Sequence, residues 1–168
     1  MAEGAVLVEF RVSNHRSIRE EQIFTTEASS SSKLASSSQS RKVQGHNKNL
    51  LPVAAIYGAN GSGKSNLLDA LAFMQRAVIH SHVHWEAGAE IPRHAFAWDD
   101  WLQRDSLLEV TLVEEGVRYV YGFVFDDNVF KEEWLYAYPK GYRQVWFERE
   151  LKDKEYQYKY GDLFHGKH

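Results

Sequence analysis

Runs of apolar residues divide the first half of the chain into two short strands and a polar connection. Residues 5–12 (AVLVEFRV) and 22–26 (QIFTT) are rich in β-branched and aromatic side chains, which predicts a hairpin-like pair of strands. Eight of the twelve residues 29–40 are serine. Because such a segment buries too little apolar surface to offset its ordering entropy, we expect a flexible surface connection over 28–48.

A continuous apolar run and a helical pattern flank a glycine cluster. Residues 51–57 (LPVAAIY) are typical of a strand buried on both faces. After the glycines, Leu67, Leu71, Met74 and Val78 recur at spacings of four, three and four, which predicts a helix from about Lys64 to about His80 with these side chains on one face.

From about residue 107 the pattern changes to β-branched and aromatic segments separated by turn residues. The segments are LLEVTLVEE, VRYVYGFVF, NVFKEEWLYAY, YRQVWFERE and EYQYKY. Their separators, such as Glu115-Gly116 and Pro139-Lys140-Gly141, predict an antiparallel meander of four or five strands. We therefore expect two regions, a lobe over 1–84 with the glycine cluster and an aromatic β-subdomain over 85–168.

Composition supports this division and narrows the chemistry. All five tryptophans and every tyrosine except Tyr57 follow residue 84. The net charge of −3 argues against a surface devoted to nucleic acid, and the absence of cysteine excludes disulfides, cysteine-type zinc sites and thiol catalysis. No segment has the pattern of a signal peptide or a membrane span, so we expect a cytoplasmic protein without a membrane partner.

The glycine cluster carries the clearest chemistry. Residues 58–65 match the Walker A pattern G-x-x-x-x-G-K-[ST] at every fixed position. In such a P-loop the backbone N–H groups cradle phosphates, Lys64 reaches the β- and γ-phosphates, and the Ser65 hydroxyl ligates Mg²⁺. The sequence therefore predicts binding of ATP and Mg²⁺. The predicted nucleotide-binding residues here are Gly58, Ala59, Asn60, Gly61, Ser62, Gly63, Lys64, Ser65 and Asn66.

Two stretches together resemble a known family. Asn14-His15-Arg16-Ser17-Ile18 after a first strand, followed by AIYGANGSGKSNLL at 55–68, resembles the N-terminal part of ABC-type ATPases of the SMC, Rad50 and RecF kind. The aromatic segments EWLYAYPKG (133–141) and WFER (146–149) look like the bacterial AAA15-type ATP-binding proteins, which occur in abortive-infection and other anti-phage systems.

The resemblance implies an α/β fold, the P-loop NTPase N-terminal lobe of an ABC-ATPase head with an antiparallel β-meander subdomain. It also implies that Arg16 lies near the bound phosphates, although His15 departs from the phenylalanine usual at its place. Such heads work by ATP-gated switching, as homodimers or with a complete head as partner, and act on an effector protein or DNA. A magnesium-sensing glutamine is expected, and Gln75, Gln103 and Gln144 are the candidates.

The family's signature loop, Walker-B acids and switch histidine have no match in the sequence, so we expect an N-terminal piece of a longer ATPase or a degenerate relative that does not hydrolyse ATP alone. The alternative is a non-hydrolysing interaction module that needs a full-length partner subunit. A third possibility is a self-contained phosphotransferase with Asp126 or Glu114 as its acid, but both residues sit beside hairpin signals. Asn47-Lys48-Asn49-Leu50 lacks the acid of a guanine-recognition element, which argues against a Ras-like GTPase.

Three weaker patterns favour plain surface roles. His80, His82 and His84 could hold a divalent metal, but a solvated segment is the simpler interpretation. The acidic and aromatic residues Trp98-Asp99-Asp100-Trp101 predict an exposed turn anchored by its indoles. The short basic clusters are Arg41-Lys42 with Lys48, and Lys140 with Arg143, and they could contact phosphates of a nucleic acid.

Overall fold

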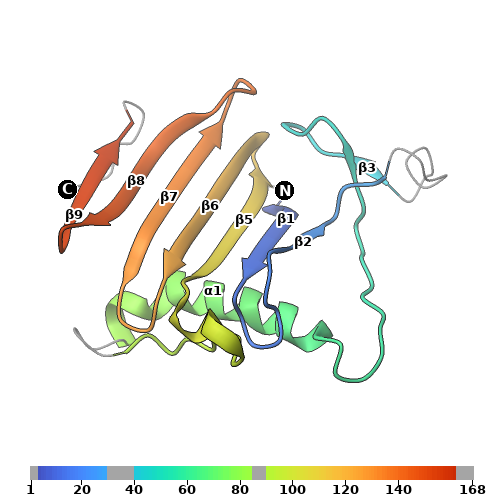
Figure 1. Cartoon of the computed structure of the whole chain (residues 1–168). Helices are drawn as coiled ribbons and strands as arrows, with labels where there is room; N and C mark the ends of the chain where they lie inside the picture. The colour runs from blue at the N-terminus through green and yellow to red at the C-terminus, as the bar shows by residue number, and fades with distance from the viewer. Residues whose placement is uncertain (1–3, 30–39, 85–89, 162–168) are drawn as a thin grey trace.

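A seven-stranded antiparallel sheet forms the body of the protein (Figure 1). The computed structural model describes residues 4–29, 40–84 and 90–161, with only the backbone of residues 81–84. The strand order is β2-β1-β5-β6-β7-β8-β9. The strands of this sheet are β1 (Val6–Ser13), β2 (Gln22–Thr25), β5 (Ser106–Glu114), β6 (Val117–Phe125), β7 (Phe130–Tyr138), β8 (Gln144–Lys152) and β9 (Glu155–Tyr160).

The predicted strand pair and the predicted five-strand meander are both confirmed. β1 pairs antiparallel with β2, and β5 to β9 pair with their neighbours in sequence order. The turn Glu115-Gly116 joins β5 to β6 with both residues at positive φ, 49° and 77°, as a two-residue hairpin turn requires. The regular turn chemistry of this half therefore sets the order of its strands.

One feature of the sheet joins the two halves of the chain. β1 pairs antiparallel with β5, so that Phe10 lies opposite Val110 and Val12 opposite Leu108. The N-terminal strands thus extend the same sheet as the aromatic strands. The division into regions 1–84 and 85–168 stays a prediction, and the sheet contains strands from both.

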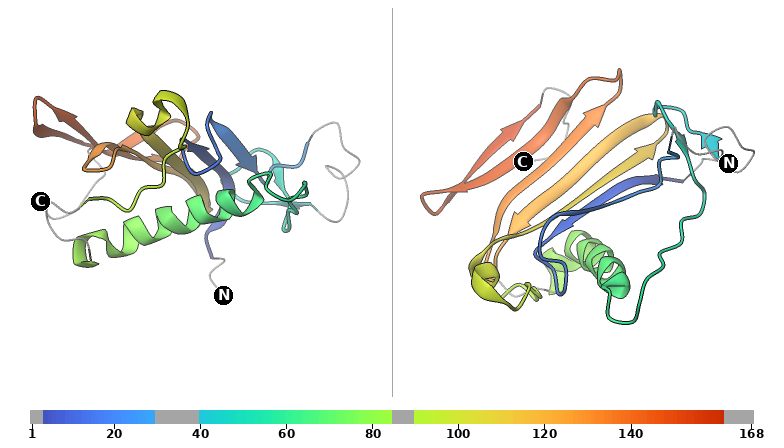
Figure 2. Two further views of the ribbon diagram at one scale, coloured as in Figure 1. Left: turned by 60° about the horizontal axis from the view of Figure 1, so that its bottom comes forward. Right: turned by 45° about the vertical axis from the view of Figure 1, so that its right-hand side comes forward.

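The single α-helix among the described residues, α1 (Lys64–His84), covers one face of the sheet (Figure 2). It begins at the predicted residue and ends four residues later than expected. Its buried face holds Ala70, Phe73, Met74 and Ala77, at spacings of three, one and three. These residues pack against Phe10, Leu108, Phe123 and Phe125 of the sheet, and the ring of Phe73 stacks on that of Phe125 with centroids 5.3 Å apart.

The predicted helix face is only partly right. Met74 is buried, Leu67 and Leu71 are partly buried against the core, and Val78 is 52% exposed. The small side chains of Ala70 and Ala77 let the helix approach the sheet, so the buried stripe is centred on them rather than on the larger leucines and valine. No helix in the described part of the chain is long and apolar enough to cross a membrane.

The region 28–48 is more ordered at its end than expected. Residues 30–39 lie outside the described residues, but β3 (Arg41–Lys42) pairs with β4 (Asn49–Leu50) as a small second sheet. Val43 and Leu50 are buried against Val8 and Val113. Val113 is five positions from Leu108 on β5, so it points to the opposite face of the large sheet from α1. Two apolar side chains therefore hold the end of this connection in place.

The expectation of a strand buried on both faces at 51–57 is wrong. Beyond Leu50 the segment is extended but makes no strand, and Val53 is 78% and Tyr57 90% exposed. A strand of that kind needs parallel neighbours on both sides. All the strand pairings of the described residues are antiparallel, and none involves this segment. Over the described residues the fold is thus mostly antiparallel sheet with α1 and a short 3-10 helix, η1 (Asp99–Gln103), and it supports the predicted α/β ABC-head fold only loosely.

Candidate functional site

The glycine cluster forms a turn that ends directly in α1. Gly61 and Gly63 adopt positive φ values of 80° and 88°, a conformation in which a side chain would be strained. Gly58 lies so close to the Ser62 hydroxyl that a Cβ on it would be 2.6 Å from Oγ. The loop therefore needs glycine at positions 61 and 63, whereas a side chain at position 58 would require the Ser62 hydroxyl to move. At the start of α1 the N–H groups of Asn66 and Leu67 donate to the Gly63 carbonyl at 2.9 and 3.3 Å. The N–H groups of Lys64 and Ser65 precede them, at the end of the helix that carries its positive dipole.

The Lys64 side chain folds back over this turn. Its Nζ donates hydrogen bonds to the carbonyl oxygens of Gly58 at 2.8 Å and Ala59 at 2.7 Å, and lies 3.5 Å from the Ser62 hydroxyl. The ammonium group is thereby held at the loop rather than free in solvent. Ser65 and Asn66 follow as the second and third residues of the helix. The loop thus brings a fixed cation beside the first two N–H groups of a helix, which is an arrangement suited to an anion.

The turn between β1 and β2 reaches this loop through Ser17. The Asn66 side-chain amide donates to the Ser17 hydroxyl at 2.6 Å, and a Cβ on Gly63 would be 2.9 Å from the same oxygen. Ser17 was not among the predicted site residues, although it belongs to the pentapeptide 14–18 that carries the resemblance. A serine in a polar turn gives no sequence signal of a contact 49 residues away.

Asn14 fixes the position of this turn. The residue is fully buried and adopts φ 54°. Its side-chain amide donates to the carbonyl oxygens of Trp101 and Arg104 at 2.8 and 2.7 Å, and its Oδ1 accepts from the Phe96 backbone N–H at 2.9 Å. The Ser106 hydroxyl donates to the Asn14 carbonyl at 2.7 Å. One buried side chain therefore connects the turn to the loop 96–105.

His15 and Arg16 attach the same turn to α1 through Asp69. His15 Nε2 lies 2.9 Å and Arg16 Nε 2.6 Å from Asp69 Oδ2. The Arg16 hydrogen bond is the main reason that the pKa of Asp69 lies below its usual value, while burial lowers the pKa of His15. His15 is therefore neutral at pH 7 and donates its Nε2 proton to the carboxylate. The predicted place of Arg16 near phosphates stays a prediction, because its side chain contacts Asp69 here.

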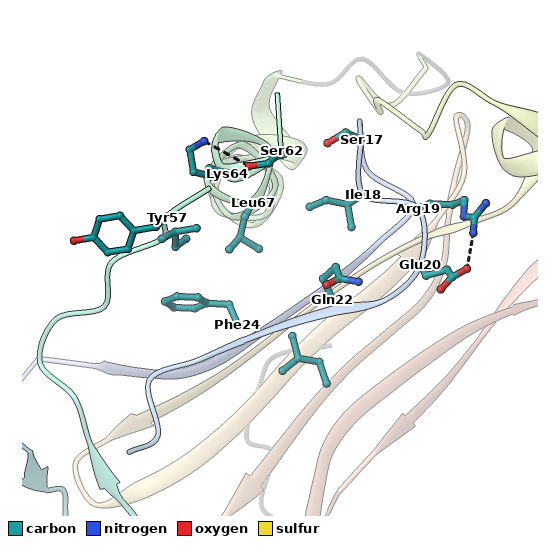
Figure 3. Close-up of a pocket in the computed structure, with 13 residues that line it drawn as sticks. Ser17, Ile18, Arg19, Glu20, Gln22, Phe24, Tyr57, Ser62, Lys64 and Leu67 are labelled. Carbon is teal, nitrogen blue, oxygen red and sulfur yellow. Dashed lines mark hydrogen bonds and ion pairs between the residues drawn. The ribbon is translucent and has the colours of Figure 1, made fainter. Parts of the chain in front are cut away.

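A cavity of about 500 Å³ lies between the loop and the β1–β2 turn (Figure 3). Ser62, Gly63 and Lys64 line it on one side and Ser17, Gln22 and Phe24 on the other. Figure 3 shows Leu67 of α1 beside the loop residues and Ile18 beside Ser17, and Tyr57 also lines the cavity. The cavity therefore brings residues of the predicted P-loop together with a turn that the sequence places more than 40 residues earlier.

The two acidic candidates for hydrolysis lie in turns. Asp126 Oδ1 accepts from the backbone N–H groups of Asn128 and Val129 at 2.8 and 2.9 Å, which closes the turn between β6 and β7. Glu114 is the last residue of β5, directly before the turn 115–116. Neither lines the cavity beside the loop. These contacts agree with the prediction that both acids belong to hairpin turns.

The remaining candidates from the sequence are the magnesium-sensing glutamines, the histidine cluster and the acidic turn at 98–101. Gln75, Gln103 and Gln144 do not line the cavity. Among the described residues no three His, Asp or Glu side chains gather as a metal site, and the side chains of His82 and His84 lie outside that part. In the acidic turn Trp101 is partly buried beside Phe96, whereas Trp98 is 72% exposed.

The predicted basic clusters are partly neutralised by acidic neighbours. Lys48 pairs with Glu27. Arg143 lies 3.9 Å from Glu148 and stacks over the ring of Tyr136 at 4.3 Å. Arg41 and Lys42 form the short strand β3. Because a nucleic-acid surface relies on cations that are free to meet phosphates, these ion pairs weaken the case for DNA contact by this part of the chain.

Comparison with known proteins places this site in a family. No curated protein matches the chain. A family model described as "AAA domain, putative AbiEii toxin, Type IV TA system" matches residues 53–157. The match begins just before the glycine loop and ends within β9, and it supports a P-loop ATPase-like domain. Since it covers more than half of the chain, the chain belongs to this family of AAA domains.

Proposed function

We propose that the loop 58–65 and the start of α1 bind ATP with Mg²⁺, as the nucleotide-binding part of an SMC/Rad50-like ATPase that acts in the cytoplasm. The observation that carries this proposal is the Lys64 ammonium, held over the loop by the carbonyls of Gly58 and Ala59 at the N-terminus of a helix. AAA-type domains generally use this nucleotide and metal.

The residues present fit such a ligand. Lys64 would supply a positive charge to the terminal phosphates, and the first N–H groups of α1 would donate to phosphate oxygens. Ser65, on the first turn of α1, would offer its hydroxyl to Mg²⁺. Ser17 and Asn66 would hold the β1–β2 turn against Gly63 beside the phosphates.

We further propose that this chain alone does not hydrolyse ATP and that it works with a complete head as partner. Asp126 is engaged in closing a turn away from the cavity. Of the acids in the described part of the chain only Glu20 lines the cavity, and it pairs with Arg19 at 2.8 Å. The apolar side chains of Val53, Ile56 and Tyr57, with Leu68 and Ile79 on the outer side of α1, are 40% to 90% exposed. Such a surface favours cover by further protein. Roles in phage defence or with DNA belong to that larger assembly.

Calorimetric titration of the chain with Mg-ATP tests the central claim. Wild type should bind, Lys64→Ala should lose measurable binding without unfolding, and the control Lys140→Ala, in the exposed β7–β8 turn, should bind as wild type does. Equal affinities of wild type and Lys64→Ala would refute the proposal. Steady ATP turnover by the purified chain would instead favour the self-contained phosphotransferase with Asp126 or Glu114 as its acid.

A further inference from the structure

The last strand of the sheet leaves one edge open. In the described part of the chain β9 pairs only with β8, at the end of the strand order, and all six of its residues are exposed. The Gly161 N–H donates to the Trp146 carbonyl at 3.0 Å, which makes these two residues a hydrogen-bonded pair. Such pairs alternate in an antiparallel ladder, so the N–H and C=O groups of Tyr156 and Tyr158 point away from β8. These groups form a row that can accept another strand.

The side chains of β9 alternate between two faces. Glu155, Gln157 and Lys159 lie on one face, and Tyr156, Tyr158 and Tyr160 on the other. The tyrosine rings already form a ladder, with centroids 6.2 Å apart between Tyr156 and Tyr158 and 6.0 Å between Tyr158 and Tyr160. The edge thus offers one charged face and one aromatic face to an incoming strand.

This strand is complementary to a second copy of itself. When two β9 strands run antiparallel with Gln157 opposite its own counterpart, Glu155 of each copy lies opposite Lys159 of the other. The same alignment sets Tyr156 opposite Tyr158, and this pair uses the outward N–H and C=O groups. Backbone pairing, charge and aromatic contacts are therefore satisfied in one register. Shifting the strands by two residues brings Lys159 opposite Gln157, and shifting them by four brings Lys159 opposite itself, so the charge pairs are lost in both cases.

We propose that two copies of this chain associate through their β9 edges in this register, which joins their sheets into one continuous sheet across a twofold axis. Lys159, which already lies 3.1 Å from Glu148 of its own chain, would then be placed between two carboxylates. This contact does not involve the nucleotide loop. The dimer should therefore form without ATP and persist in Lys64→Ala. A failure of the proposed ATP binding would leave the dimer proposal standing.

Introduced cysteines test the register, since the chain contains none of its own. In Gln157→Cys the two thiols would face each other in a non-hydrogen-bonded pair, where the Cα atoms lie about 4.5 Å apart, within the range for a disulfide. In the control Glu155→Cys the thiols would lie four residues apart along the strands, about 13 Å. Mild oxidation should therefore crosslink Gln157→Cys into a dimer and leave Glu155→Cys as a monomer on a denaturing gel.

Charge reversal tests the partner. Glu155→Lys and Lys159→Glu each turn two attractive pairs into two repulsive ones, which should weaken self-association about tenfold in sedimentation equilibrium. A mixture of the two variants restores both attractive pairs, so it should form heterodimers as strong as the wild-type dimer. This rescue also shows that both variants are folded.

The proposal is overturned if the wild-type chain sediments as a monomer at about 100 µM, well above the micromolar range of weak interfaces. It is equally overturned if a dimer forms but Gln157→Cys does not crosslink, if Glu155→Cys crosslinks as fast, or if the mixture of charge variants associates no better than either variant alone.

Discussion

Replacing Asn14 by alanine removes the side chain that connects the β1–β2 turn to the loop 96–105. The variant would leave the N–H of Phe96 without its acceptor, whereas the carbonyls of Trp101 and Arg104 keep the Arg104 N–H and the Arg93 guanidinium as donors. A buried polar group left unsatisfied costs about 1–3 kcal/mol. Alanine at the φ of 54° that Asn14 adopts adds strain of about 1 kcal/mol. We therefore expect the free energy of unfolding to fall by about 2–4 kcal/mol.

Urea unfolding followed by tryptophan fluorescence measures this loss. With a denaturant slope of about 2 kcal/mol/M for a chain of this size, the midpoint should move down by roughly 1–2 M. The matched control is Asn128→Ala in the exposed β6–β7 turn, where only the backbone N–H of Asn128 is engaged with Asp126 and the loss should stay below about 0.5 kcal/mol. A loss of less than about 1 kcal/mol for Asn14→Ala would refute the reasoning, because the amide would then not be holding the two segments together.

Three further changes have defined outcomes. Ser17→Ala removes the acceptor of the Asn66 amide and should weaken ATP binding about three- to tenfold by calorimetry, whereas Ser13→Ala at the end of β1 should not. Burial keeps the pKa of His15 below that of an unfolded histidine, so the unfolded chain binds more protons and the urea midpoint should fall as the pH drops below about 6.5. In His15→Phe the midpoint should no longer fall over this pH range. The stability that Asp69 contributes should be lost only below about pH 4, because its pKa is depressed in the folded chain. An unchanged pH profile in His15→Phe would contradict the assignment. Asp126→Ala should lower the melting temperature through loss of two turn hydrogen bonds but leave ATP affinity unchanged, and a collapse of binding in a folded variant would give this acid a role at the nucleotide.

Local patterns predicted the meander, because the alternation of apolar and polar residues and the turn residues that define each hairpin lie close together in the sequence. The start of α1 at Lys64 was likewise marked by the glycine loop. The pairing of β1 with β5 could not be predicted in this way, since nothing in a strand states which distant strand it will join.

The segment 51–57 shows the opposite case. Its composition is that of a buried strand, but burial depends on neighbours that the described residues do not supply. In the site, the loop residues were identifiable from their spacing, whereas Asn14 and Ser17 act through contacts to residues 49 and more positions away. Their residue types are ordinary for a turn, so only the folded geometry distinguishes them.

The pairing of β1 with β5 also determines when the nucleotide loop can be assembled. Ser13 lies opposite Leu107, so these strands enclose the whole stretch that contains the glycine loop and α1. Closing a loop of this length is slow compared with forming the local hairpins of β5 to β9. On the ribosome, the apolar β1 must wait until β5 has emerged, and the turn that brings Ser17 to Gly63 is held in place only afterwards. The nucleotide site can therefore form only after β1 has paired with β5. A nascent chain stalled before residue 107 should not retain ATP.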